Sequence, residues 1–247
     1  MKVLISPTKT MNVSSIDSTS LPLFHSTAKS IAKKIRKLSQ EEIQDWMGIS
    51  EKIAVTTFHW YQNFDQHTQP AALSYAGEGF KYLSYATLDS TATQHANDSL
   101  RILSALYGYL RPMDSISLYR LDLTYRMSKI SSPSLVNIYQ NKITKVLLHE
   151  TSESELILNC TSGEYTQLLD EEALRKHRNY VTIQFLQKKN NTLSSISMHS
   201  KKARGMFARW AIKHQATSIM DLHGFDLDGY TFSHQDDKSI TFIKHLD

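Results

Sequence analysis

The chain has 247 residues, with 28 lysines and arginines against 24 aspartates and glutamates, and 40% of its residues are hydrophobic. These values are typical of a folded globular protein, and they exclude a chain that is disordered along most of its length. The length allows one large domain or two small ones. No internal repeat, linker or low-complexity tract divides the sequence, so we expect a single compact domain over residues 1–247.

The first half of the chain predicts one strand followed by helices. An apolar run that stops at Pro7 reads as a buried strand. Apolar side chains then recur at helical spacing, and serines stand where a helix should be capped. We expect a strand at Lys2–Ser6 and helices over Ser26–Leu38, from the capping box Ser39–Glu42 to Met47, after Ser50, and over Asp98–Tyr107.

The second half predicts a helix, a buried strand and two hairpins. β-branched and aromatic residues flank Asn190-Asn191 and again flank Asp236-Asp237, as in hairpins. The expected ranges are a helix at Leu135–His149, a strand at Leu156–Leu158, a hairpin of Tyr180–Gln187 with Thr192–Met198, a helix at Lys201–His214 and a hairpin over Gly229–Lys244. Together these elements predict an α/β fold with a mixed β-sheet flanked by helices.

The sequence also indicates the cellular location of the protein. Cys160 is the single cysteine, so an internal disulfide and a C-x-x-C pair are excluded. The first apolar run is too short for the core of a signal peptide, and no run approaches the roughly 18–20 apolar residues that span a bilayer. We therefore expect a cytoplasmic protein with no membrane partner.

Residues 39–64 resemble a helix-hairpin-helix, in which two short helices meet at a small-residue turn. Gly48, Ile49 and Ser50 form that turn, whose backbone N–H groups and following helix N-terminus can hold a phosphate, with Lys52 adding charge. The alternative is an ordinary helix corner that packs Ile49 and Ile53 inward, and the sequence leaves both interpretations open.

Two predicted helices are strongly basic. Residues 29–37 and 201–213 each contain five lysines or arginines and no acid. In the second helix an apolar stripe faces the core, while Lys202, Arg209 and Lys213 form a separate ridge that should be a positive surface. Such a surface favours a polyanion. The alternative is a solvated face, or pairing with acids that are distant in the sequence.

Polar residues follow the predicted strands and form a third candidate site. In open α/β sheets, ligands bind beyond the carboxyl ends of the strands. Ser6, Lys9, Arg111, Arg120 and Glu164 can build an anion pocket with one carboxylate for acid–base work. The alternative is that these side chains tether loops by hydrogen bonds and form buried ion pairs. No phosphate loop, dinucleotide fingerprint or metal-ligand spacing is present, so we expect no cofactor and no metal.

Several stretches in order along the chain resemble one family. They are Leu4–Met11, Leu103–Asp114, Tyr119–Leu121, Asn159–Tyr165, Lys201–Met206, Gly224-Phe225 and Gly229-Tyr230. They are similar to the bacterial peroxide stress resistance protein YaaA family over nearly the whole chain. The resemblance implies a cytoplasmic protein that protects against hydrogen peroxide, is linked to limiting free iron and oxidative DNA damage, and binds DNA in a positively charged cleft.

Two functional readings follow. The first is a monomeric, non-enzymatic protein that holds DNA mainly through its phosphates, with no catalytic residues. Its DNA-binding residues would be Lys9, Gly48, Ile49, Ser50, Lys52, Arg111, Arg120, Lys201, Lys202, Arg204, Arg209 and Lys213. The second is an enzyme that acts on a small phosphorylated or nucleotide-like substrate in the anion pocket described above. This second reading requires the pocket residues to lie together.

Overall fold

A computed structural model of the chain describes residues 1–246. Its strands are β1 (Lys2–Ile5), β2 (Gln69–Pro70), β3 (Leu100–Ser104), β4 (Gly108–Leu110), β5 (Ser115–Ile116), β6 (Leu156–Cys160), β7 (Asn179–Lys189), β8 (Thr192–Ser194), β9 (Tyr230–Gln235) and β10 (Ser239–His245). Its helices are α1 (His25–Ile35), α2 (Gln40–Met47), α3 (Glu51–Gln62), α4 (Ala71–Ser74), α5 (Glu78–Leu83), α6 (Ser90–Ser99), α7 (Leu135–Glu150), α8 (Gly163–Thr166), α9 (Glu171–His177), α10 (Ser197–Lys213) and α11 (Ile219–Leu222).

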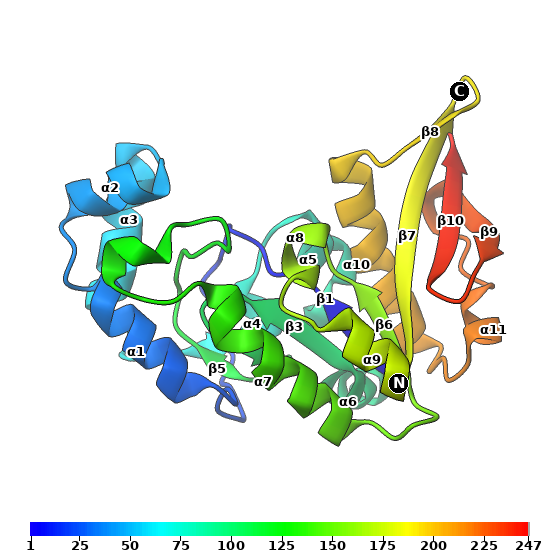
Figure 1. The fold of residues 1–247 in the computed structure, drawn as a ribbon, viewed down its shortest axis with the longest axis horizontal. Helices are drawn as coiled ribbons and strands as arrows, with labels where there is room; N and C mark the ends of the chain where they lie inside the picture. The colour runs from blue at the N-terminus through cyan, green and yellow to red at the C-terminus, as the bar shows by residue number, and fades with distance from the viewer. Residues whose placement is uncertain (247) are drawn as a thin grey trace.

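A mixed sheet forms the centre of the molecule, in the order β4-β3-β1-β6-β7-β10-β9, with β8 paired to β7. Strands β3, β1, β6, β7 and β10 run parallel to one another. The strands β4 and β9 at the two edges, and β8 beside β7, pair in antiparallel fashion. Figure 1 shows α7 and α9 in front of the sheet, while α6 and α10 contact each other behind it. The predicted mixed α/β architecture is therefore confirmed.

Helices α1, α2 and α3 form a group at one end of the long axis, away from α10 and the β9–β10 hairpin (Figure 1). The predicted capping box starts α2, because Ser39 accepts a hydrogen bond from the Glu42 backbone and the Glu42 side chain accepts one in return. Helix α1 buries the predicted face, although it begins at His25 without a side-chain cap.

The prediction of a helix over Asp98–Tyr107 is wrong. Helix α6 ends at Ser99, and the residues that follow it form β3, which is buried along its entire length. Leu100, Ile102 and Leu103 place apolar side chains on both faces of this buried strand, so the same residues also satisfy a helical spacing. The predicted β7–β8 hairpin is confirmed, but β8 ends at Ser194 and Met198 already belongs to α10.

None of the helices described in residues 1–246 is long and apolar enough to cross a bilayer.

Candidate functional site

The carboxyl ends of β1 and β6 open into a central cleft. The two strands are parallel neighbours, with Ile5 opposite Cys160, so the loops that follow them leave the sheet side by side. The loop after β1 brings Ser6 and Lys9, and the turn into α8 brings Glu164. The cleft encloses a cavity of about 410 Å³. This is the position at which open α/β sheets bind ligands.

Hydrogen bonds hold the two loops of the cleft together. The Ser6 hydroxyl accepts a hydrogen bond of 2.8 Å from the backbone N–H of Ser162 and donates to its hydroxyl at 3.3 Å. The loop after β1 also contacts the segment that leads into α5, because the hydroxyl of Thr8 accepts a hydrogen bond from the backbone N–H of Gly77. Tethering of loops, part of the alternative interpretation of these polar side chains, therefore accounts for Ser6. Ion pairs with buried carboxylates, the other part of that alternative, account for Lys9 with Asp122 and for Arg111 with Asp114.

Two carboxyl groups, those of Asp122 and Glu164, lie within hydrogen-bonding reach of each other in the cleft. Lys9 Nζ contacts Asp122 Oδ2 at 2.5 Å, and Thr124 donates to the other oxygen of Asp122 from its backbone and its hydroxyl. Burial alone would raise the pKa of Asp122, but the hydrogen bonds from Glu164 and Lys9 outweigh it and lower that pKa. The hydrogen bond to Asp122, together with burial, raises the pKa of Glu164 to about 7.

Helix α10 supplies the cations on the other side of the cavity. Lys201 is exposed at its edge, and Arg204 is mostly buried one turn further along the helix. Nε of Arg204 is buried and has no hydrogen-bond partner within residues 1–246. Burial lowers the pKa of Arg204, and its titratable neighbours are Cys160 and Tyr230 rather than a carboxylate. Burial also raises the pKa of Cys160 to about 12, so this thiol is not activated.

The predicted basic ridge on α10 is not a free positive surface. Lys202 Nζ pairs with Asp228 at 2.6 Å and lies over the ring of Tyr82. Arg209 donates to the backbone carbonyls of Leu83 and Ser84 at 3.0 and 2.8 Å, and so ties α10 to the end of α5. The expectation that these two cations lack partners is therefore wrong, because their partners come from distant segments. Lys213, at the end of the helix, is exposed.

The predicted turn between α2 and α3 is present, but it lies far along the molecule from α10 (Figure 1). Gly48 adopts the left-handed conformation with φ of +60°, whereas Ser50 is extended at φ −67° and begins α3. Only the first of these positions favours glycine, so serine fits the second without strain. Ile49 is partly buried against the core, whereas Ile53, also expected to pack inward in a helix corner, is exposed, as is Lys52. Whether this turn holds DNA stays a prediction.

The two arginines assigned to the anion pocket do not line it, so the five residues that the enzyme reading requires to lie together are not brought together. Arg111 forms an ion pair with Asp114 at 3.0 Å and donates to the carbonyl of Leu21. Arg120 follows Tyr119 but lies outside the cavity, with its Nε buried and unpaired within residues 1–246. The cavity is instead lined by Arg204 and Lys201. Asp122 was missed, since nothing in its local sequence marks it as a partner of Glu164.

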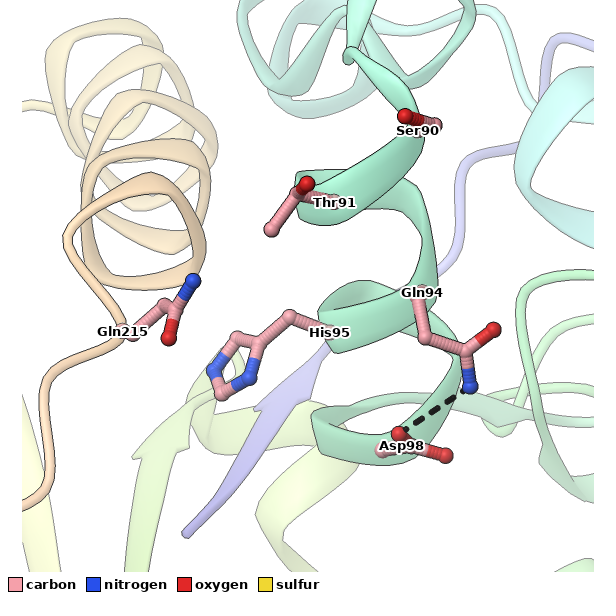
Figure 2. Close-up of a pocket in the computed structure, with 6 residues that line it drawn as sticks. All are labelled: Ser90, Thr91, Gln94, His95, Asp98 and Gln215. Carbon is pink, nitrogen blue, oxygen red and sulfur yellow. Dashed lines mark hydrogen bonds between the residues drawn. The ribbon is translucent and has the colours of Figure 1, made fainter.

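A second hollow lies beside α6 and the end of α10. Figure 2 shows His95 pointing toward Gln215, while Gln94 donates to Asp98 at 3.3 Å. Burial lowers the pKa of His95, so its imidazole is held neutral. No lysine or arginine of residues 1–246 lines this hollow, whereas the central cleft brings lysines, an arginine and two carboxyl groups together, so the central cleft is the stronger candidate.

Comparisons with known proteins agree with the resemblance noted in the sequence. The family model described as peroxide stress protein YaaA matches residues 1–236. A UPF0246 protein of Rhizorhabdus wittichii is 35% identical over 99% of both chains, and one of Clostridium perfringens is 32% identical over 98% of both. A UPF0246 protein of Ruegeria pomeroyi is 33% identical over 94% of this chain and 93% of its own. The chain belongs to the peroxide stress protein YaaA family.

Proposed function

We propose that this member of the YaaA family contributes to peroxide protection by binding a small phosphorylated or nucleotide-like ligand in the central cleft. The observation that carries the proposal is the buried Nε of Arg204, which has no hydrogen-bond partner within residues 1–246. A buried charge without a counter-charge is costly, and proteins pair such groups with an anion. No carboxylate of residues 1–246 supplies that anion, so we assign the role to a ligand.

The surroundings of Arg204 support a phosphate in particular. Lys201 stands three residues earlier on α10, and side chains at this spacing share a helix face. A guanidinium fork suits two oxygens of one phosphate, and a lysine adds a point charge. Ser6 and Ser162 offer hydroxyl groups on the facing wall. A cavity of about 410 Å³ is also of the size that small ligands occupy.

Calorimetric titration with inorganic phosphate and with a nucleoside monophosphate tests this proposal. Arg204→Met keeps most of the side-chain volume and removes the charge, so the affinity should fall at least about tenfold, or about 1.4 kcal/mol. Lys213→Met, an exposed cation at the end of the same helix, is the matched control and should bind as the wild type does. The proposal fails if the wild type binds neither probe, or if a folded Arg204→Met variant binds equally well.

A second candidate function is DNA binding, which the resemblance implies together with a cytoplasmic location. It is favoured by the charge of residues 173–220, which contain ten lysines and arginines and no aspartate or glutamate. Lys189, Lys201 and Lys213 of this segment are exposed. Exposed cations of this kind would contact phosphates and give an affinity that falls steeply with salt. Lys202 and Arg209 are weaker candidates because they already have partners.

A gel-shift titration at two salt concentrations separates the two candidates. Charge reversal at Lys189 and Lys213 should weaken binding to a DNA duplex and reduce its salt dependence. Lys52→Glu tests the turn between α2 and α3 independently. If DNA binds and Arg204→Met leaves that binding intact, the DNA surface is separate from the cleft. The resemblance also implies a link to free iron. Measuring intracellular iron in a strain that carries Arg204→Met tests whether the cleft contributes to that link.

A further inference from the structure

The carboxyl pair of the central cleft requires a proton. Oε1 of Glu164 is buried, and no donor of residues 1–246 reaches it in the geometry described. Its neighbour is the carboxyl group of Asp122. Two ionised carboxylates offer only acceptors and repel each other, so they can bond to one another only when one of them is protonated. The arrangement is therefore that of two carboxyl groups sharing one proton.

The environment places this proton on Glu164. Asp122 receives Lys9 on one oxygen and the N–H and hydroxyl of Thr124 on the other, so its ionised form is stabilised. Glu164 has no comparable set of donors. The pKa of Glu164 is accordingly raised to about 7, while that of Asp122 is lowered. Near neutral pH, Glu164 is divided between its protonated and its ionised form.

An anion in the cleft would change this balance. The charged groups that face Glu164 are Asp122, which favours its protonation, and Lys9 and Lys201, which oppose it. Tyr165 is its buried neighbour on α8, and Glu78 of α5 lines the opposite wall. An oxyanion held by Lys201 and Arg204 neutralises one of the opposing cations and adds a negative charge nearby. Both effects favour the protonated form of Glu164.

We propose that the binding of an oxyanion in the central cleft is coupled to the uptake of one proton by the Asp122–Glu164 pair, which removes one of the two negative charges that face the ligand. This inference rests on the proposed function, because it needs an anion at Arg204. It adds that the affinity of the site for an anion depends on the protonation state of the Asp122–Glu164 pair. The proton comes from solvent, and the ligand class is an oxyanion such as a phosphate ester.

Calorimetric titration with inorganic sulfate tests the coupling, because sulfate has no titrating proton of its own between pH 6 and pH 8. Titrations in buffers of different ionisation enthalpy give the number of protons exchanged. We expect almost no uptake at pH 6, where Glu164 is already protonated, and close to one proton at pH 8. The affinity should fall by up to about tenfold per pH unit above pH 7.

Two variants identify the group that takes up the proton. Glu164→Gln is permanently neutral, so it should bind sulfate at pH 8 without proton uptake and with an affinity that no longer depends on pH. Glu78→Gln removes a carboxylate from the opposite wall of the same cavity and should keep the uptake. Sulfate binding without proton exchange at pH 8 would overturn this inference alone. Absence of sulfate binding at both pH values would also contradict the proposed function.

Discussion

Gly205→Ala offers a sharp test of the packing that builds the cleft. Helices α5 and α10 approach each other at Gly79 and Gly205, and both glycines line the cavity. A Cβ atom at Gly205 would stand 2.0 Å from the carbonyl oxygen of Gly79 and 2.8 Å from its carbonyl carbon. These are backbone atoms, so no side-chain rotation relieves the overlap, and one helix must move away from the other.

The expected loss of stability follows from two opposing effects. Overpacking of this kind costs about 1–3 kcal/mol, and the rigid backbone contact places this case near the upper end. Alanine also gains about 1 kcal/mol over glycine inside a helix. The variant should therefore be less stable than the wild type by about 2 kcal/mol, measured as the free energy of unfolding in urea. Because α5 forms a wall of the cleft, the affinity of the Gly205→Ala variant for phosphate should fall as well.

Gly79→Ala is the matched control for this experiment. Its Cβ atom would lie 3.5 Å from the carbonyl oxygen of Lys201, which is an ordinary contact. The control should therefore be as stable as the wild type or more stable by up to about 1 kcal/mol, from helix propensity alone. If Gly205→Ala matches or exceeds the wild type in urea, the close approach of the two helices is not as described.

Three further predictions concern the buried polar groups. The raised pKa of Glu164 means that the folded chain holds this proton more tightly than the unfolded chain, so stability falls as the pH rises from about 5 and the loss is complete above the folded-state pKa of about 7. Urea midpoints of Glu164→Gln should accordingly differ less between pH 5 and pH 8 than those of the wild type; an equal difference would place the proton elsewhere. Cys160 is buried with its pKa raised to about 12, so the native protein should resist thiol reagents and hydrogen peroxide, and mass spectrometry should detect modification only after unfolding. Ser104→Ala should cost about 1–3 kcal/mol in urea, because the hydroxyl of Tyr119 and the backbone N–H groups of Leu106 and Tyr107 lose their buried partner; a cost below about 0.5 kcal/mol would argue against this network.

The sequence by itself determined the elements whose signals are local. The capping box at Ser39 and the amphipathic pattern of α1 involve residues within one or two turns of each other, so they could be predicted without any partner segment. The mixed α/β class followed from the alternation of such elements. Polar residues after β1 and β6 also predicted part of the cleft, because parallel strands carry their loops to one edge.

Only the tertiary structure decided which charged side chains are free and which are paired. The sequence offers Lys202 no acid within its own helix and leaves pairing with distant acids open, and the chain brings Asp228 to it from a distant turn. The pairing of Asp122 with Glu164, and the separation of Arg204 from the carboxylates of residues 1–246, arise in the same way, from segments that fold together. Spacing along a chain reports which residues share a face of one element, whereas the charge of a cleft depends on which elements meet there.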